Sequence, residues 1–484
     1  MRLLISVVCT WAFGASLLAA LPGCGKDSGG GSVTEFDAGD TVVLFEGEPF
    51  PDCDSELEQA TAQNEPWISI DPNNRDHIVA MWQTRWARGF VAAVTFDGGA
   101  TWETSIIPGI SRCTGGEARV SDPWLAFSTN GDLYSVALNH PDEETKTSRI
   151  LVNKSLDGGL TWSDPVTVGQ ADEPFAEDKP SISADPFDEC IVYVGWNRFD
   201  DLSLVPNSPG EVFFSRTTDC GETWSEPQGL YRTRPSGIGF QTVVLPDGDV
   251  LAFFRETNFS IAQARTLYML RSTDQGVTWS DEPVEVAVIR QTVPRTPDGE
   301  EPIRSSSNLF DVAVDRSTGR LVAVWEQFFG EGIVGESQVA FTQSDDGGLT
   351  WTEAVRIDQT PESPTATLNQ AFVPVVEISD DGTIGVTYYN FENDTPDMLP
   401  SETDNWFIHC HPDLADCTDP ASWADPVRVT KESFDISKAI ASSRGLFLGD
   451  YMGLTSFGSD FFTAFTVTLP SETQNIVFAP ILGR

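Results

Sequence analysis

The sequence predicts an all-β protein, a β-propeller of four-stranded antiparallel blades, and three observations support this prediction. An eight-residue phrase, Ser-Leu-Asp-Gly-Gly-Leu-Thr-Trp over 155–162, returns in closely similar form four more times. The five aspartates of these phrases follow one another at intervals of 60, 62, 55 and 72 residues, a spacing typical of repeat architectures. Three apolar segments precede each phrase and a fourth follows it, which is the composition of a blade.

The repeated phrase itself predicts a tight turn between the third and fourth strands of each blade. Ser or Thr, Asp, Gly, Thr and Trp hold the same offsets in every copy. The Asp carboxylate can accept backbone N–H groups of the turn, and the Gly can adopt a positive φ. The Trp can pack as a large apolar plug where the next strand begins.

This phrase resembles the Asp-box, or bacterial neuraminidase repeat, of sialidase-like β-propellers. In that family the box is a structural turn remote from the active site, so the resemblance identifies the fold better than the function. We therefore expect the box aspartates to be folding residues: Asp97, Asp157, Asp219, Asp274 and Asp346.

The apolar segments predict seven blades, with six as the alternative because the sialidases have six. The sixth unit starts at Phe372, and its box has degenerated into the segment between Cys410 and Cys417. Three further apolar segments, 451–456, 461–467 and 475–479, lack a fourth strand, whereas the segment 41–45 is a strand without a blade. Joining the two would close the ring and leave no open sheet edge.

The N-terminus predicts an exported protein. Residues 1–23 have the pattern of a signal peptide, and Leu21-Pro22-Gly23-Cys24 resembles the lipobox of bacterial lipoproteins, with Cys24 as the lipidated residue. Pro22 is unusual at its position, so cleavage at a neighbouring site is an alternative. Residues 24–40 are expected to be a flexible tether and 41–484 the propeller. The expected location is the outer membrane or cell surface through a lipid anchor, or otherwise the periplasm or medium.

The composition restricts the partners and cofactors. Lys and Arg number 29 against 73 Asp and Glu, a formal net charge of −44, which argues against nucleic acid as a partner. We interpret the acidic residues as a solvated surface rather than calcium sites. The four histidines show no metal-ligand spacing, and the chain has neither a Gly-Xaa-Ser-Xaa-Gly elbow nor a phosphate loop. We therefore expect no metal and no cofactor.

Six cysteines remain beyond Cys9 and Cys24, an even number that predicts disulfides in an exported chain. The blade map favours pairing within three couples, and free buried thiols are the alternative. The couples are Cys53 with Cys113, Cys190 with Cys220, and Cys410 with Cys417.

The strand order places the boxes on one face of the ring and the ends of the second strands on the opposite face. In sialidase-like propellers the ligand lies on this second face, over the central channel. The ends of the second strands supply these candidate ligand-binding residues: Arg85, Asn139, Trp196, Asn197, Arg198, Arg255 and Trp325. The starts of the first strands add Glu65, Asp122, Asp178, Lys179, Gln241, Gln370, Asp450 and Tyr451.

Three arginines, Arg85, Arg198 and Arg255, occupy equivalent positions in three units. Guanidinium groups clamp carboxylates bidentately, and the resemblance implies a three-arginine site for the carboxylate of a sialate. The alternative is that these arginines pair with local carboxylates and hold the blades together.

The resemblance also implies a tyrosine nucleophile with a carboxylate base and a separate acid. Tyr388 or Tyr389 are the candidates for the nucleophile and Glu256 or Glu326 for its base. Asp122 or Asp178 could be the acid.

The sialidase motif Phe/Tyr-Arg-Ile-Pro is absent, and Asn64-Glu65-Pro66-Trp67 occupies its region. These roles therefore rest on blade position and not on a matched motif. We expect an exo-glycosidase of the sialidase type that acts on cell-surface or extracellular glycans. The alternatives are a non-catalytic propeller that binds carbohydrate or protein, and a structural or assembly propeller.

Overall fold

The computed structural model describes most of the chain after residue 33. The expected signal peptide, Cys24 and most of the tether lie outside the described residues, as does Arg85. The described ranges are 34–53, 62–84, 88–117, 119–140, 147–200, 209–257, 264–290, 292–307, 309–330, 336–360, 370–394, 400–470 and 474–484.

The described chain is almost entirely β, with only short helical turns such as Pro420–Ser422 and Ile436–Lys438. Its first three sheets each contain four antiparallel strands that pair in chain order. The first contains β3 (Gln63–Asp71), β4 (Asn74–Thr84), β5 (Phe90–Thr95) and β6 (Glu103–Ile106). The second contains β7 (Arg119–Phe127), β8 (Leu133–His140), β9 (Thr147–Ser155) and β10 (Val166–Asp172). The third contains β11 (Ala176–Ala184), β12 (Val192–Phe199), β13 (Gly210–Thr217) and β14 (Gln228–Thr233).

Three further sheets repeat this order. The fourth contains β15 (Gly237–Val244), β16 (Val250–Glu256), β17 (Arg265–Ser272) and β18 (Val284–Ile289). The fifth contains β20 (Asp311–Val314), β21 (Leu321–Gln327), β22 (Gln338–Ser344) and β23 (Val355–Arg356). The sixth contains β24 (Ala371–Ile378), β25 (Ile384–Asn390), β26 (Glu402–Cys410), β27 (Val427–Arg428) and, paired to β26, β28 (Phe434–Asp435).

The last sheet joins the two ends of the described chain. Its strands β31 (Gly453–Phe457), β32 (Asp460–Thr468) and β33 (Gln474–Gly483) are C-terminal, whereas β1 (Phe36–Ala38) and β2 (Val42–Val43) both pair antiparallel to β33. Val42 is opposite Phe478 and Val43 is opposite Val477. This confirms the pairing of 41–45 with 475–479 that the sequence predicts.

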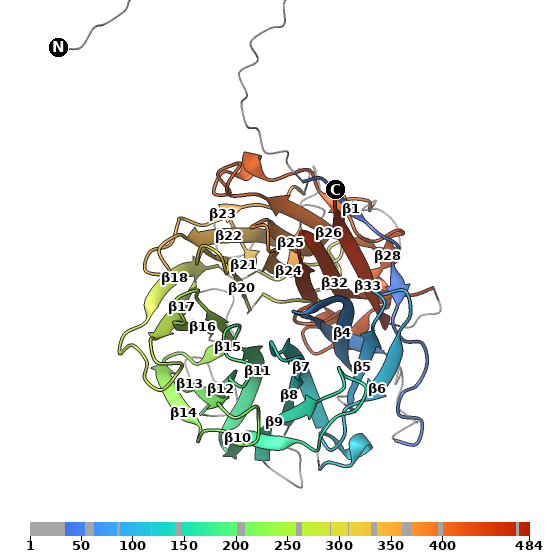
Figure 1. The fold of residues 1–484 in the computed structure, drawn as a ribbon. Coiled ribbons are helices and arrows are strands. Elements are labelled where there is room, and N and C mark those ends of the chain that lie inside the picture. Colours follow the sequence, from blue (N-terminus) through green and yellow to red (C-terminus); the bar gives the residue numbers. More distant parts are fainter. Residues whose placement is uncertain are drawn as a thin grey trace, which may run out of the picture. The chain divides into compact units, whose positions relative to one another are not determined.

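The first strands of these seven sheets contact one another in cyclic order. β3, β7, β11, β15, β20, β24 and β31 each contact the next, and β31 contacts β3. Figure 1 shows the sheets distributed around a common centre. Buried hydrophobic clusters lie between neighbouring sheets; one, for example, combines Val136 and Ile150 of the second sheet with Val194 and Trp196 of the third. The core is therefore divided among the sheet interfaces, and the first strands surround a central space.

One small sheet was not expected from the sequence. β19 (Ile303–Arg304) pairs parallel to β30 (Gly445–Phe447), which pairs antiparallel to β29 (Ile440–Ser442). These strands come from the long connections before the fifth and the seventh sheets. They bring segments more than a hundred residues apart in the chain into contact.

The repeated phrases form the turns that the sequence predicts. Asp157 accepts hydrogen bonds from the Thr161 backbone N–H at 2.8 Å, the Thr161 hydroxyl at 2.6 Å and the Ser155 hydroxyl at 2.9 Å. The Ser155 hydroxyl in turn accepts the N–H of Gly159, whose φ is 101°. The same contacts recur at Asp97, Asp219, Asp274 and Asp346.

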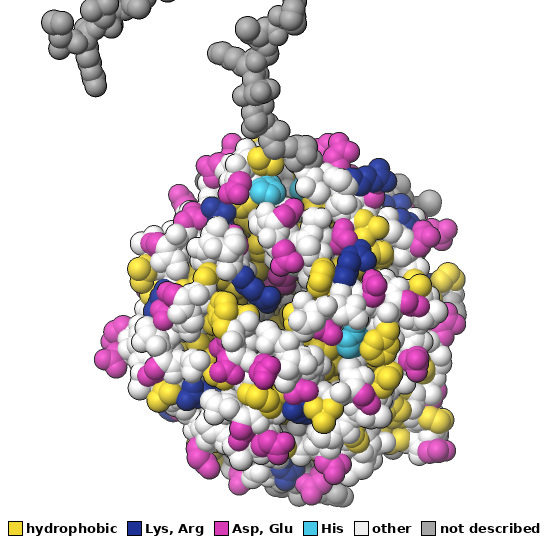
Figure 2. All heavy atoms as spheres, viewed as in Figure 1, with side chains coloured by type: hydrophobic (Ala, Val, Ile, Leu, Met, Phe, Trp, Pro, Cys, Tyr) yellow, Lys and Arg dark blue, Asp and Glu magenta, His cyan; other side chains and the backbone are white. Residues whose placement is uncertain are grey.

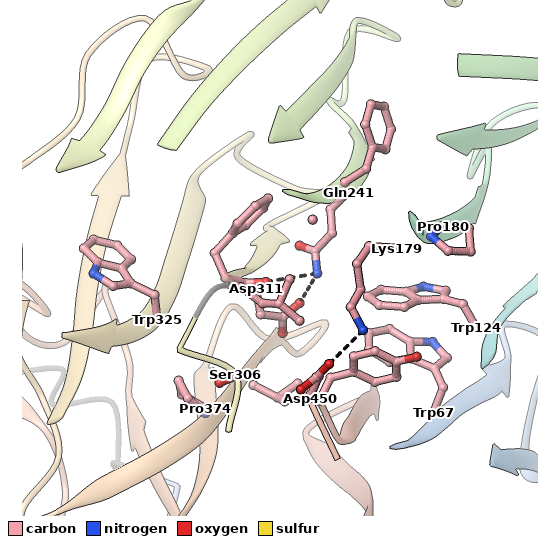
Figure 3. Close-up of a pocket in the computed structure, with 16 residues that line it drawn as sticks. Trp67, Trp124, Lys179, Pro180, Gln241, Ser306, Asp311, Trp325, Pro374 and Asp450 are labelled. Atoms are coloured by element: carbon pink, nitrogen blue, oxygen red, sulfur yellow. Dashed lines mark hydrogen bonds and ion pairs between the residues drawn. The ribbon is translucent and has the colours of Figure 1, made fainter. Parts of the chain in front are cut away.

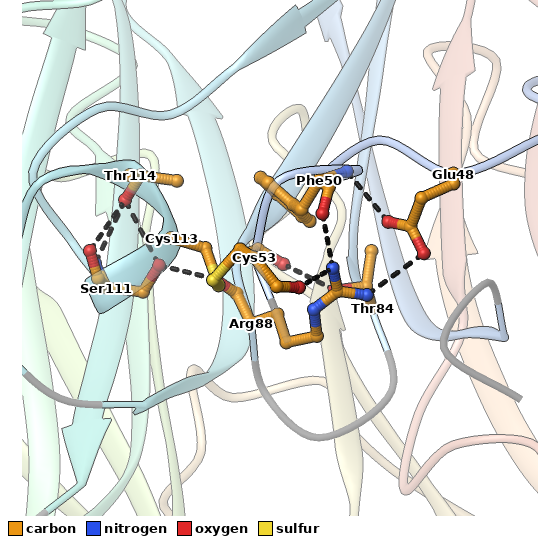
Figure 4. Close-up of a disulfide and its surroundings, with 9 residues drawn as sticks. Glu48, Phe50, Cys53, Thr84, Arg88, Ser111, Cys113 and Thr114 are labelled. Carbon is orange, nitrogen blue, oxygen red and sulfur yellow. Dashed lines mark hydrogen bonds and ion pairs between the residues drawn. A yellow bond between two sulfur atoms is a disulfide. The ribbon is translucent and has the colours of Figure 1, made fainter. Parts of the chain in front are cut away.

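The three expected disulfides are present, linking Cys53 to Cys113, Cys190 to Cys220 and Cys410 to Cys417. The first of them fastens the loop after β6 to the segment before β3 (Figure 4).

The buried Arg88 stabilises the same N-terminal segment. It forms an ion pair with Glu48 at 3.1 Å and donates to the carbonyl oxygens of Phe50 and Cys53 (Figure 4). The strand ahead of the first sheet is therefore held by a covalent link as well as by β pairing.

Replacing Asp157 with alanine should lower the free energy of unfolding by about 1–3 kcal/mol, because three donors lose a shared acceptor. Chemical denaturation would measure the loss. Asp164→Ala is the control, since Asp164 is exposed and adjacent to the same turn. Equal stability of the two variants would contradict the structural role of the box.

Candidate functional site

The same β-bulge interrupts the first strand of several sheets. The strand register shifts between Asn64 and Trp67, between Ser121 and Trp124, between Asp178 and Ser181, and between Phe372 and Val375. Within each bulge one residue has a positive φ and a proline follows it. These residues are Glu65 (53°), Asp122 (59°), Lys179 (48°) and Val373 (51°).

Such a backbone is strained for residues other than glycine and costs of order 1–3 kcal/mol at each position. Because the bulges lie at equivalent points of adjacent sheets, they bring the side chains of Glu65, Asp122 and Lys179 together. These three residues recur at intervals of 57 residues, each directly before a proline. All three residues were candidates from the sequence, and this regular spacing is the signal that relates them.

Lys179 is the centre of a buried group of charges. Its Nζ lies 2.9 Å from Asp450 Oδ2 and 3.8 Å from Glu65 Oε1, and it also contacts Asp122 Oδ1. Arg304 of β19 binds Asp450 from the other side, with Nε 2.9 Å from Oδ1 and Nη2 2.5 Å from Oδ2. We call Glu65, Asp122, Lys179, Arg304 and Asp450 the lysine cluster.

The protonation states of the lysine cluster follow from burial and pairing. Burial raises the pKa of Glu65 to about 8, although Lys179 opposes the shift. Burial also acts on Asp450, but Arg304 and Lys179 hold the pKa of its carboxyl far below the usual range. Lys179 likewise keeps the pKa of Asp122 low against burial. At neutral pH the cluster therefore contains two cations, two carboxylates and one protonated glutamic acid.

Asp122 has a second set of partners. The Ser121 hydroxyl lies 2.6 Å from Asp122 Oδ2 and 2.6 Å from His140 Nε2. Burial lowers the pKa of His140 to about 4, so its ring is neutral. Ser121 has one proton, which it donates to the carboxylate, and it must then accept the Nε2 proton of His140.

An aromatic pocket adjoins the lysine cluster (Figure 3). It contains about 540 Å³ of empty space, including the part open to solvent. Lys179 and Asp450 line it together with Trp67, Trp124, Phe240, Phe310, Trp325 and Tyr451. The Trp67 and Trp124 rings are stacked, with centroids 3.4 Å apart. We call this the upper pocket.

A second pocket, which we call the lower pocket, contains about 450 Å³ of empty space, again including the part open to solvent. It shares Trp67, Trp124, Gln241 and Asp311 with the upper pocket. Asp311 accepts hydrogen bonds from Gln241 Nε2 at 2.7 Å and from the Val376 N–H at 2.8 Å. Burial raises the pKa of Asp311 to about 6 and that of Glu377, which also lines the lower pocket, to about 7. Figure 2 shows one face of the protein, with a hollow near its middle and acidic side chains spread widely over it.

The structure brings part of the predicted site together. Asp122 belongs to the lysine cluster and Trp325 lines the upper pocket. Asp178 precedes Lys179 and accepts its backbone N–H at 2.9 Å, and burial raises the pKa of Asp178 to about 6. The contributions of Arg304, Asp311 and Glu377 were missed, because nothing local in the sequence relates them to these residues.

The predicted tyrosines do not face the pockets. Both are fully buried, and the Tyr389 hydroxyl donates to the carbonyl oxygen of Thr466 at 2.9 Å. Tyr388 packs in the core between the fifth and sixth sheets. Burial raises the pKa of both hydroxyls far above the usual value. A nucleophilic role for either residue conflicts with this placement.

The predicted bases are not positioned to assist those tyrosines. Glu326 is buried, and it accepts the hydroxyl protons of Ser305 and Ser306 at 2.8 Å and the N–H of Val373 at 2.9 Å. Glu256 ends β16 and is partly buried, which raises its pKa. Neither carboxylate has a described hydrogen bond to a tyrosine.

The described arginines have separate environments. Arg198 forms an ion pair with Glu177, as the alternative interpretation of these residues expects. Arg255 is fully buried, and its Nη1 donates to the carbonyl oxygen of Ser307 at 2.8 Å. With Arg85 outside the described residues, the three-arginine clamp stays a prediction.

The remaining candidates are buried within or between sheets. Asn139 Nδ2 donates to the carbonyl oxygen of Ile110 at 3.0 Å. Trp196 packs in the core between the second and third sheets, and Asn197 is fully buried beside it in β12. None of the three lines the described pockets.

Two classes of site receive no support from the described residues. They contain no group of three or more His, Cys, Asp or Glu side chains arranged to hold a metal ion. Where the three carboxyl groups of Glu65, Asp122 and Asp450 converge, the ammonium group of Lys179 contacts all of them. No helix in the described part of the chain is long and apolar enough to cross a membrane.

Fold and site thus define an all-β protein whose repeated four-stranded antiparallel sheets surround an aromatic pocket with buried charges. No protein-family model matches the sequence, and no curated protein is significantly similar to it.

Several solved structures are similar in fold. A protein of unknown function from Dyadobacter fermentans is 14% identical, covers 93% of this chain and 99% of its own, and has a TM-score of 0.48. The GH93 α-L-arabinofuranosidase of Fusarium graminearum, solved with arabinobiose, is 13% identical over 92% of this chain and 98% of its own, with a TM-score of 0.48. The Hadza microbial sialidase Hz136 is 16% identical over 84% of this chain and 73% of its own, with a TM-score of 0.45. Similarities this distant carry no argument about the chemistry.

Replacing Lys179 with methionine should cost about 3–5 kcal/mol of unfolding free energy, because it leaves Asp122 buried without a cationic partner. Adding Asp122→Asn should recover part of that loss, since the unpaired charge is then removed. Chemical denaturation of the single and double variants measures both effects. Lys431→Met, at an exposed lysine, is the control and should change stability by less than about 1 kcal/mol. A double variant no more stable than Lys179→Met would refute the pairing argument.

Proposed function

We propose that the chain is an exported, sialidase-like β-propeller of seven blades that binds a carbohydrate in its central channel. The cyclic contacts of the seven first strands support the blade count. The pairing of β1 and β2 with β33 supports a ring closed by the N-terminal strands. The five Asp-box turns support the sialidase-like assignment.

Export is supported by the three disulfides, which form in oxidising compartments. On this proposal residues 1–23 are removed and Cys24 bears the lipid anchor. The protein would then reside in the outer membrane or on the cell surface and meet extracellular glycans there.

The observation that carries the carbohydrate proposal is the stacked pair Trp67 and Trp124 beside charged and amide groups in one pocket. Ligand pockets combine apolar walls with a few polar groups that fix orientation. A sugar ring has both an apolar face and hydroxyl groups, so it matches this combination. Gln241, Asp311 and Ser306 line the same pocket and offer hydrogen bonds to those hydroxyls.

Trp124→Ala should weaken binding of the cognate sugar by about two- to tenfold, because an aromatic contact of this kind contributes roughly 0.5–1.5 kcal/mol. Tryptophan fluorescence against a glycan panel would identify that sugar, and arabinobiose and sialosides belong in the panel. Trp224→Ala is the matched control, since Trp224 lies in a box turn outside the pockets. Failure of every sugar to bind would overturn the proposed function.

Glycoside hydrolysis is the second candidate function, and the protonation pattern of the lysine cluster favours it. Glu65 is an acid with a pKa of about 8, beside carboxylates that remain ionised. Glu65 and Asp450 both lie against Lys179 Nζ, so their nearest oxygens lie within roughly 7 Å of each other. A protonated acid paired with a carboxylate is the arrangement that glycosidases use. The deep burial of these groups favours binding without hydrolysis.

If hydrolysis occurs, Glu65→Gln should reduce kcat by about 10²–10⁴-fold and leave sugar affinity unchanged. The activity of the natural protein should fall as the pH rises through about 8, because Glu65 then loses the proton it must donate. Chromogenic glycosides would measure both effects. Activity that survives in Glu65→Gln would exclude this acid, and no activity on any glycoside would leave sugar binding as the function.

A further inference from the structure

The lining of the two pockets is net negative. Its charged residues are Lys179, Asp311, Glu377 and Asp450. Lys179 is already paired with Asp450 and with Asp122 outside the lining. Asp311 and Glu377 form no ion pair in the described part of the chain, although the charge of Arg316 acts on Glu377 and lowers its pKa against the effect of burial.

Two hydroxyl groups of the lower pocket lack hydrogen-bond partners in the described part of the chain. Ser181 and Thr242 both line it, and their side chains are buried. Neither Ser181 Oγ nor Thr242 Oγ1 has a hydrogen-bond partner among the residues that the structure describes. A buried hydroxyl without a partner is destabilising, so these groups are suited to a polar ligand in the pocket.

Glu377 has the most capacity left for a ligand. The one described hydrogen bond to its carboxylate is from the N–H of Ile378, at 3.0 Å. Both oxygens of Asp311, in contrast, already accept a hydrogen bond from Gln241 or Val376. A donor that enters the lower pocket would therefore be bound chiefly by Glu377, with Ser181 and Thr242 nearby.

The aromatic residues favour a cationic donor. Trp67 and Trp124 line both pockets, and an ammonium group over a tryptophan face gains cation–π attraction. The net charge of −44 also raises the local concentration of cations at low ionic strength. An acidic sugar would meet repulsion from both effects.

We propose that the ligand is a sugar with a protonated amine, and that Glu377 of the lower pocket binds this amine. The inference that the ligand is a sugar rests on the proposed function. The inference that it has an amine rests on the charge and the unpartnered hydroxyls of the lower pocket. The upper pocket then holds the ring against the tryptophans. An amino sugar and its N-acetylated form differ in the charge that the lower pocket would recognise.

The test compares oligosaccharides of glucosamine with their N-acetylated counterparts, using calorimetry at low salt and at pH 7, where about half of the Glu377 carboxyl groups are ionised. The natural protein should bind the amine form at least tenfold more tightly. Glu377→Gln should remove most of that preference. Glu282→Gln should keep it, because Glu282 is exposed in a turn outside the pockets and its replacement changes the net charge by the same amount.

The outcomes separate this inference from the proposed function. Equal affinity for both forms would overturn the amine site and leave sugar binding intact. A preference that survives in Glu377→Gln would overturn the assignment to the lower pocket. If a simple aliphatic diamine binds as tightly as the amino sugar, the result would support the amine site and overturn the proposal that the ligand is a sugar. No binding of any sugar or amine would overturn both proposals.

Discussion

The chemistry of the central channel depends on the bulge that interrupts the first strand of successive sheets. Without it, each first strand would continue its regular alternation, and charged side chains at these positions would enter the apolar interfaces between sheets. With it, Glu65, Asp122 and Lys179 meet at one level. The following proline cannot donate a ladder hydrogen bond, which suits a position where the ladder is already broken.

Burying charged side chains is unfavourable in free energy, and the ion pairs of the lysine cluster offset this cost. Lys179 contacts carboxyl groups of the first sheet, of the second sheet and of the segment before the seventh sheet. Arg304, from the small extra sheet, binds the last of these groups. Lys179, the cation in the lining of the upper pocket, is consequently occupied. A carboxylate ligand of the sialate type would have to compete with Asp122 and Asp450 for it, whereas no described ion pair engages Asp311 or Glu377 of the lower pocket.

Tyr388 and Tyr389 show that a position near the end of a strand does not determine whether a side chain is exposed. Tyr388 and Tyr389 are adjacent in β25, the second strand of its sheet, so their side chains point to opposite faces. In this architecture each face of a sheet packs against a neighbouring sheet. Tyr388 therefore enters one interface and Tyr389 the other, and neither reaches the channel.

Local signals in the sequence were sufficient for the strands, the box turns, the three disulfides and the pairing of the N-terminal segment with 475–479. Each depends on contacts within one repeat or on the demand that a sheet edge be covered. The site depended on tertiary structure, because its residues come from separate repeats. Arg304 reaches Asp450 across 146 residues, and Asp311 shares the lower pocket with Glu377 of the next sheet. The ion pairs of the site, the burial of its side chains and their protonation states arise only when the sheets assemble. Each depends on contacts between residues that are distant in the sequence.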